Sequence, residues 1–432
     1  MLLNFQVANW ACFRDPVSFT MEAGPERDTD GHLARIGAKS RPLKVLPVAA
    51  IYGNNASGKS QFIAALAFLR NLVVEEYKTG RLPFAPFLLN DKFAKEPTRF
   101  LIQFVVNDEI YELEVLLTES EIRQETLSRY NSRNSEKTSV YVREEQKVVS
   151  CSWGGDAYCQ YVKTMTVDPT RLFLTLSAIF AAGKDELVAA IYNWFARSLV
   201  IIKPGSHYIG VDDYCTDGRI ARRTQDYLAR FDTGISRLDA ESVPLSVFHP
   251  SLIEEVRNLL APGASLHRLI GNEVFMFSVD AKRELVAQRL VALHTKATGG
   301  ETPFPISLES EGTRRMLDFI PAIARLTEPN QSMTFVVDEI DNKLHHLVTR
   351  ALVEDFIATC SADTRTQLIF TTHDLLLMDQ ALCRRDEMWV TDKAPDGSAT
   401  LTDFSAFKGL RKGTKIRDVY LDGRLGGIPR HI

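Results

Sequence analysis

The stretch from Val48 to Leu66 reads VAAIYGNNASGKSQFIAAL and contains the pattern GxxxxGK[ST]. A short apolar run leads into the pattern, and Phe62, Leu66 and Leu69 recur behind it at helical spacing. This order predicts a strand, a phosphate-binding loop and a helix, because glycines let backbone N–H groups surround a phosphate and the helix adds its positive dipole end. We therefore expect a nucleotide to bind the loop residues Gly53, Asn54, Asn55, Ala56, Ser57, Gly58, Lys59 and Ser60.

An acidic pair further along the chain extends this loop to an expected MgATP site. Lys59 is expected to reach the β- and γ-phosphates, and the Ser60 hydroxyl to ligate Mg²⁺. In FVVDEIDN, Asp338 closes an apolar strand and is predicted to hold Mg²⁺ through a water, while Glu339 is predicted to be the general base that polarises the attacking water. Many phosphate-loop GTPases and kinases lack the second acid, and the chain has no Asn-Lys-x-Asp motif for guanine. ATP is therefore the favoured nucleotide.

Two further motifs are weaker on their own. His373 ends a third apolar strand in FTTHD, where a neutral imidazole can hydrogen-bond the γ-phosphate or the attacking water. Ser310 and Gly312 in SLESEGTRRML precede a helical pattern and so form a second anion-binding arrangement. A structural histidine and an ordinary helix cap are the alternatives for these two motifs.

Composition limits the class of protein. The chain has 432 residues, 45% of them apolar, and a formal net charge of −4, as in a globular protein of roughly two or three domains without an overall sign of nucleic-acid binding. The chain has six scattered cysteines without a CxxC pair, no signal peptide and no apolar run approaching ~18 residues. These features predict a soluble, cytoplasmic protein without membrane contact. Apolar strands that alternate with helices around the motifs predict an α/β core with a mainly parallel sheet, whereas the middle of the chain reads as helical.

The order of the motifs resembles that of ABC-type ATPase heads: phosphate loop, long insertion, Ser-x-Gly, Asp-Glu and His. Within these, the chain is similar to the RecF/SMC/OLD branch and to the RloA-like ATPases of bacterial anti-phage systems, which include the ATPase subunit of PARIS and relatives of the Septu ATPase. The stretches that carry the resemblance are MLLNFQVANWACFRDPVSFTM, IYGNNASGKS, SEGTRR, VVDEIDNKLHHLV, FTTHD and YLDGRLGGIP. It covers residues 1–178 and 265–432, which we expect to form the two lobes of one head, with 179–264 as an inserted helical domain for dimerisation or partner docking.

The resemblance implies roles that the residues alone do not give. Ser310 and Gly312 would contact ATP bound to an opposing subunit, and Asp341 and Asn342 would lie at the interface, so a homodimer or higher homo-oligomer is implied. OLD nucleases carry a Toprim domain behind the ATPase, for which this chain leaves no room. A nuclease or other toxin would therefore be a separate effector protein.

The chain also departs from its relatives at two places. Ala11 stands where relatives often have an arginine that approaches the nucleotide, and Arg14 is a possible substitute. The pair His345-His346 stands where relatives tend to have His-Pro. Gln103 is a candidate for the Q-loop, although the glutamine can equally face one side of its strand.

These observations predict a slow ATPase whose nucleotide state controls a separate toxic effector in anti-phage defence. The alternatives are a RecF/SMC-like ATPase that acts directly on DNA in repair or maintenance, and a scaffold that binds ATP but hardly hydrolyses it. Two basic clusters fit a solvated helix surface best, with DNA contact or docking of an acidic partner as the functional alternatives. The clusters are Arg219, Arg222, Arg223 and Arg230, and Arg411, Lys412, Lys415 and Arg417.

Overall fold

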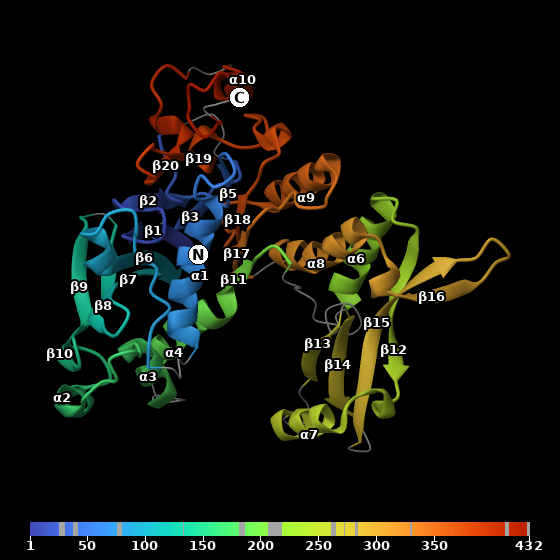
Figure 1. Ribbon diagram of the computed structural model, residues 1–432, viewed down its shortest axis with the longest axis horizontal. Coiled ribbons are helices and arrows are strands. Elements are labelled where there is room, and N and C mark those ends of the chain that lie inside the picture. The colour runs from blue at the N-terminus through green and yellow to red at the C-terminus, as the bar shows by residue number, and fades with distance from the viewer. Residues whose placement is uncertain are drawn as a thin grey trace. The chain divides into compact units, whose positions relative to one another are not determined.

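The computed structural model forms two compact units, between which the chain passes more than once (Figure 1). Unit 1 comprises Met1–Pro204, Pro329–Asp341 and Val353–Ile432, and unit 2 comprises Gly205–Glu328 and Asn342–Leu352. The structure describes residues 1–25, 31–37, 42–75, 80–132, 134–180, 186–205, 218–260, 265–271, 273–280, 284–328, 331–410 and 414–429.

A six-stranded sheet at the centre of unit 1 carries the phosphate loop. Its order is β11-β17-β18-β5-β19-β20, and every neighbouring pair is parallel except β19 and β20. The strands are β11 (Leu199–Ile202), β17 (Thr334–Val337), β18 (Gln367–Thr371), β5 (Val48–Tyr52), β19 (Met388–Lys393) and β20 (Ala399–Asp403). All residues of β5, β17 and β18 are buried, which explains their continuous apolar sequences. The predicted mainly parallel sheet is confirmed.

A seven-stranded antiparallel sheet forms the second layer of unit 1. Its strands, in order, are β10 (Lys147–Cys151), β9 (Glu136–Glu144), β8 (Ile122–Asn131), β7 (Glu109–Leu117), β6 (Thr98–Val106), β1 (Leu2–Ala8) and β2 (Val17–Thr20). The helix behind the phosphate loop, α1 (Lys59–Val74), packs against it, with the Phe62 ring 5.5 Å from that of Phe5 and 5.3 Å from that of Phe19. Asn107 and Asp108 turn the predicted β6–β7 hairpin with φ of 52° and 60°, as a tight primed turn requires.

Smaller elements complete unit 1. Two short strands pair with each other, β3 (Ala34–Ile36) and β4 (Leu43–Val45). The helices are α2 (Asp156–Thr164), α3 (Phe173–Phe180), α4 (Glu186–Asn193) and α10 (Ile416–Leu421), together with most of α9 (His346–Thr359), whose first turns belong to unit 2.

Unit 2 contains a sheet of its own. Its strands are β12 (Ile235–Val243), β13 (Ser265–Ile270), β14 (Glu273–Val279), β15 (Leu285–Thr295) and β16 (Glu301–Pro305), paired in the order β12-β15-β14-β13 with β16 also on β15. Its helices are α6 (Gly218–Arg230), α7 (Pro250–Leu259) and α8 (Glu311–Leu326). The apolar face of α8 shares a core with β15, which includes Leu317, Ile320, Leu290 and Ala292.

This architecture differs from the expected division at residues 178 and 264. The segment 179–264 holds α4, α6 and α7 as expected from its helical patterns, but also β11 in the central sheet of unit 1 and β12 in unit 2. Antiparallel pairing of β12 with β15, which aligns Ile235 with His294, joins this segment to residues beyond 264. The long-range pairing therefore makes a mixed α/β unit where a helical insertion was expected. None of the described helices has the length and apolarity that crossing a bilayer would need.

Candidate functional site

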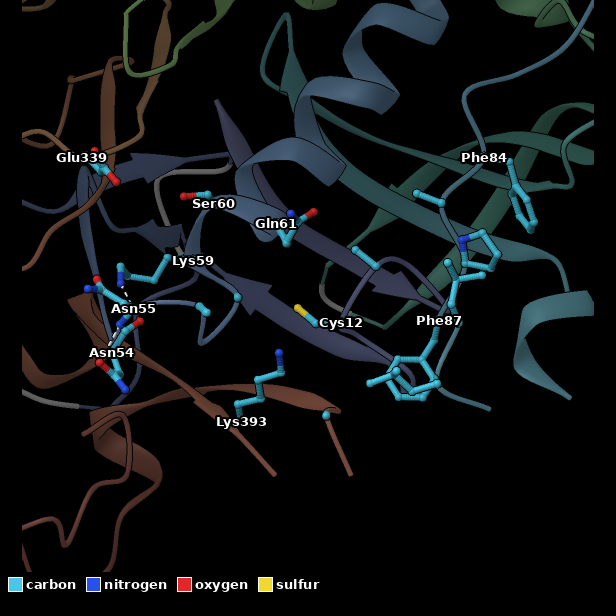
Figure 2. Close-up of a pocket in the computed structure, with 18 of the residues that line it drawn as sticks. Cys12, Asn54, Asn55, Lys59, Ser60, Gln61, Phe84, Phe87, Glu339 and Lys393 are labelled. Carbon is cyan, nitrogen blue, oxygen red and sulfur yellow. Dashed lines mark hydrogen bonds between the residues drawn. The ribbon is translucent and has the colours of Figure 1, made fainter. Parts of the chain in front are cut away.

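A pocket of about 700 Å³ in unit 1 opens over the phosphate loop (Figure 2). Lys59 and Ser60 line it from the loop, and Glu339 and His373 line it from the segments that follow β17 and β18. β5, β17 and β18 are parallel, so the residues that follow them meet at one edge of the sheet. The expected strand–loop–helix context of Gly53–Ser60 is present, and the three motifs that follow apolar strands come together in this pocket.

Two glycines give the loop its shape because a side chain at either position would collide with neighbours. Gly53 has φ of 148°, and a Cβ there would lie 2.4 Å from Thr391 Oγ1 and 2.7 Å from the Thr391 carbonyl oxygen. Gly58 has φ of 119°, and its Cβ would lie 3.1 Å from Cys12 Sγ. The Ser57 and Thr391 hydroxyls lie 2.5 Å apart, which joins the loop to β19. The loop is therefore held from the side by a strand far away in the sequence.

Lys59 is the buried cation of the pocket. Its ammonium donates to the carbonyl oxygens of Gly53 at 2.7 Å and Asn54 at 3.0 Å, and the residue is only 5% exposed. Burial lowers the pKa of Lys59 to about 8, although the carboxylates of Asp338, Glu339 and Asp341 act in the opposite direction. A phosphate that replaced these two carbonyl contacts would favour the charged form of the lysine.

The acidic residue Asp338 lies at the centre of a short hydrogen-bond chain. Its Oδ1 accepts from Ser60 Oγ at 3.2 Å and from Thr371 Oγ1 at 2.6 Å, and Thr371 Oγ1 in turn accepts from the Glu339 backbone N–H at 2.7 Å. The hydroxyl of Ser60 and the carboxylate of Asp338 are oxygen ligands of the kind that Mg²⁺ prefers, and they lie beside the lysine that would hold the phosphates. These residues thus fit the predicted metal site. Thr371 was not singled out from the sequence.

Glu339 and His373 face the same pocket from neighbouring strand ends. Glu339 has φ of 54°, a left-handed conformation that is uncommon for a residue with a side chain and is found enriched at functional sites. The Asp341 carboxylate accepts from the His373 backbone N–H at 3.2 Å, which connects the two strand ends. Burial and then the charge of Lys59 lower the pKa of His373, so the imidazole is neutral at pH 7.

The other end of the pocket is apolar and was not predicted from the sequence. Phe84, Phe87, Leu88 and Leu89 line it, and the two leucines are 72% and 70% exposed. Backbone contacts to the N-terminal segment fix this stretch: the Ala11 N–H donates to the Ala85 carbonyl at 2.6 Å, and the Phe87 N–H donates to Asn9 Oδ1 at 3.0 Å. Figure 2 shows Phe84 and Phe87 on the side of the pocket away from Glu339. An apolar wall of this kind suits the flat face of a nucleobase.

Ser310 and Gly312 lie in unit 2, at the start of α8. Ser310 is the N-cap of this helix, and its Oγ accepts from the Thr313 backbone N–H at 3.1 Å. A Cβ on Gly312 would lie 3.0 Å from the carbonyl oxygen of Lys343, so the glycine permits close approach of the residues that follow the acidic pair. Ser310 thus forms the helix cap that was the alternative interpretation of this motif, and the contact with a second subunit's nucleotide stays a prediction.

The remaining candidates make internal contacts. Gln103 is buried in β6, where it donates to Glu112 Oε2 at 2.7 Å and accepts from Asn4 Nδ2 at 2.6 Å, so its side chain makes contacts within its own sheet, as in the alternative interpretation. Arg14 binds the carboxylates of Asp15 and Asp396.

The basic clusters are also partly engaged. Arg219 and Arg223 both pair with Glu328, which follows the end of α8, at 3.5 Å and 3.7 Å, within unit 2. Of the C-terminal cluster, Arg411 and Lys412 lie outside the described residues. The rings of His345 and His346 are tilted by 30° relative to each other, with centroids 4.2 Å apart.

Comparison with known proteins agrees with this site. A family profile described as "AAA domain, putative AbiEii toxin, Type IV TA system" matches residues 48–163 and 209–379, more than half of the chain. The chain belongs to this family. The matched ranges of the AAA-domain family include the phosphate loop, the start of α8, the acidic pair and His373. No curated protein matches the chain. A solved structure titled "Crystal structure of the SmcHead bound to the C-winged helix domain of ScpA" is similar, at 12% identity and a TM-score of 0.42, over 95% of this chain and 99% of that chain.

Unit 1 of this AAA-domain protein has a mixed α/β fold with a mainly parallel sheet. The phosphate loop follows β5, the histidine follows the neighbouring strand β18, and the acidic pair follows β17, which lies on the far side of β18. Helix α1 packs against the antiparallel sheet. The narrower resemblance to RloA-like ATPases stays a prediction.

Proposed function

We propose that this protein binds MgATP in the pocket of unit 1 and hydrolyses it slowly. The observation that carries the proposal is that Lys59, Ser60, Glu339 and His373 line one pocket and that Asp338 accepts a hydrogen bond from Ser60. The loop N–H groups and Lys59 would bind the phosphates, and Mg²⁺, held by Ser60 and by Asp338 through a water, would neutralise charge that develops on them. Glu339 would take a proton from the attacking water, and the neutral His373 imidazole would orient that water or the γ-phosphate.

The test is phosphate release by the full chain in the presence of MgATP. Lys59→Ala should abolish nucleotide binding, because the buried ammonium is the main cation at the phosphates. Glu339→Gln should keep binding and lower turnover by about 10²–10⁴-fold, the usual contribution of a general base. Glu119→Gln is the matched control, since this carboxylate is 59% exposed and pairs only at the surface with Arg81. Unchanged turnover in Glu339→Gln would remove Glu339 from its proposed role.

We further infer that ATP promotes assembly through a second copy of the chain. The positive dipole end of α8 would favour an anion at its first turn, where Ser310 Oγ already accepts from the Thr313 N–H. With MgATP, Glu339→Gln should accumulate as a dimer or higher oligomer in light scattering, whereas Lys59→Ala should not assemble. A purely binding scaffold would instead give wild-type assembly without measurable phosphate release.

The assembly is proposed to control a separate toxic effector in anti-phage defence. The description of the family, which names a toxin and a toxin–antitoxin system, supports a role in controlled toxicity. Co-expression with the neighbouring open reading frame should give a complex whose toxicity depends on Lys59. Hydrolysis stimulated by duplex DNA would favour direct action on DNA instead, although Glu328 already pairs with Arg219 and Arg223 of the basic helix.

A further inference from the structure

A second lysine lines the nucleotide pocket and has no role in the motifs described above. Lys393 is the last residue of β19 and is exposed, and Figure 2 shows its ammonium pointing into the pocket beside Cys12. Among the described residues that line the pocket, Lys59 and Lys393 carry the ammonium groups. Among the described residues, the Lys393 ammonium has no hydrogen-bond or ion-pair partner, unlike that of Lys59, which contacts two loop carbonyls.

The alternation of β19 explains why this lysine faces the loop. Side chains two residues apart on a strand point to the same face, so Lys393 shares a face with Thr391. Thr391 contacts the phosphate loop directly through the Ser57 hydroxyl, and the intervening Asp392 points the other way, where its Oδ1 accepts from the Gly427 N–H at 3.2 Å. The register of β19 beside β5 therefore fixes which side chain reaches the pocket.

The position along the pocket indicates which part of the nucleotide is near. Glu339 marks the end where the γ-phosphate would lie, and Phe84–Leu89 mark the apolar end. Lys393 neighbours Cys12, where its charge partly offsets the burial that raises the pKa of the Cys12 thiol. Gly397, which lines the pocket just beyond Lys393, is packed so tightly against Leu89 that a Cβ would lie 2.2 Å from Leu89 Cδ1. Lys393 thus lies toward the apolar end.

The other nearby cation is already engaged. Arg14, the expected substitute for the arginine missing at Ala11, donates to Asp396 Oδ2 at 2.6 Å and to Asp15 Oδ2 at 2.7 Å. These two carboxylates more than balance its charge. A nucleotide with several negative charges would therefore meet Lys59 on one side of the loop and Lys393 on the other.

We propose that Lys393 binds the α-phosphate of the nucleotide. The inference rests on the proposed nucleotide-binding function. ATP and ADP both have an α-phosphate, so loss of a contact with it should weaken the binding of both nucleotides to the same extent. Loss of a contact with the γ-phosphate would weaken the binding of ATP alone.

The test is equilibrium binding of ATP, ADP and adenosine to the full chain at low and moderate salt. Lys393→Gln should weaken ATP and ADP equally, by about tenfold, as expected for one charge-assisted contact at an exposed position, and should leave adenosine unchanged. It should also reduce the salt dependence of ATP binding. Lys393→Arg should bind like the wild type, and Lys408→Gln, which removes an exposed lysine outside the pocket, is the matched control.

The outcomes separate this inference from the function on which it rests. Wild-type protein that binds no nucleotide would overturn the proposed function. Wild-type binding together with equal affinities of Lys393→Gln and Lys408→Gln would overturn the role of Lys393 alone, as would a loss confined to ATP. Thermal melting checks the fold, and Lys393→Met, which keeps the aliphatic stem, replaces Lys393→Gln should the latter melt early.

Discussion

Thr371 is expected to be as important to the acidic pair as the acids themselves. The residue is buried at the end of β18, donates to Asp338 Oδ1 at 2.6 Å and accepts from the Glu339 N–H at 2.7 Å. Thr371→Val keeps the shape of the side chain but removes both hydrogen bonds. The variant therefore measures what holds Asp338 and Glu339 in place, with little change in packed volume.

The expected cost follows from the two lost contacts. A hydrogen bond to a charged carboxylate contributes about 1.5–3 kcal/mol, and an N–H left without a partner costs about 1–3 kcal/mol. Asp338 keeps its contact with Ser60, so we expect the free energy of unfolding to fall by about 3 kcal/mol, toward the lower end of the summed range. Glu339, held at φ of 54°, would also lose its anchor. A misplaced catalytic group commonly costs about 10²-fold in rate, so turnover should fall by this order.

The assays are urea unfolding, nucleotide binding and phosphate release on the same protein samples. Nucleotide affinity should change little, because Lys59 and the loop do not contact Thr371. Thr371→Ser is the matched control, since it keeps the hydroxyl and loses only a methyl group, at about 1 kcal/mol. The reasoning is refuted if Thr371→Val unfolds and turns over ATP like Thr371→Ser.

Two further predictions concern residues that stabilise unit 1. Arg143 is fully buried, donates to the Asp168 carbonyl at 2.8 Å and pairs with Glu125 at 3.4 Å. Arg143→Met should therefore lower the free energy of unfolding in urea by about 3–5 kcal/mol, and its combination with Glu125→Gln should cost less than the sum of the two single losses. Additive losses would contradict this coupling. Gly427 has φ of 71°, and a Cβ there would lie 2.4 Å from Val390 Cγ2. Gly409, the control position, has φ of 90° but open space around it, so Gly427→Ala should lower the free energy of unfolding by about 1–3 kcal/mol more than Gly409→Ala. Equal melting temperatures of the two variants would contradict this prediction.

The core of the candidate site could be predicted because its motifs are local. Each motif follows a short apolar strand, and parallel strands place the residues behind them at one edge of a sheet. The sequence therefore indicated Lys59, Asp338, Glu339 and His373 without knowledge of the strand order. Thr371 escaped notice because its role depends on which strands are neighbours. The register that aligns Val337 with Phe370 puts Asp338 and Thr371 side by side.

Long-range contacts explain what the sequence could not predict. The apolar end of the pocket depends on hydrogen bonds that the Asn9 side chain and the Ala11 backbone make with residues 85–87, and no local pattern in the sequence indicates that these two segments are partners. In unit 2, the residues of β12 (ISRLDAESV) are mostly only half-buried or exposed, so they lack the apolar alternation that indicates a strand. The strand forms because β15 offers it a partner about 50 residues away, and this pairing is the reason that the expected domain boundaries differ from the compact units.

The phosphate loop is supported by the strands on both sides of β5, which bears on how a nucleotide could promote the proposed assembly. β18 supplies the Thr371 hydroxyl to the acidic pair, and β19 supplies the Thr391 hydroxyl to Ser57. A loop fixed in this way loses little conformational freedom when a nucleotide binds, so binding within unit 1 alone should change the fold only slightly. A nucleotide can shift an equilibrium only by its different affinity for the two states. The difference must therefore come from groups outside the loop, and the contacts proposed for Ser310 and Gly312 of a second copy are of that kind.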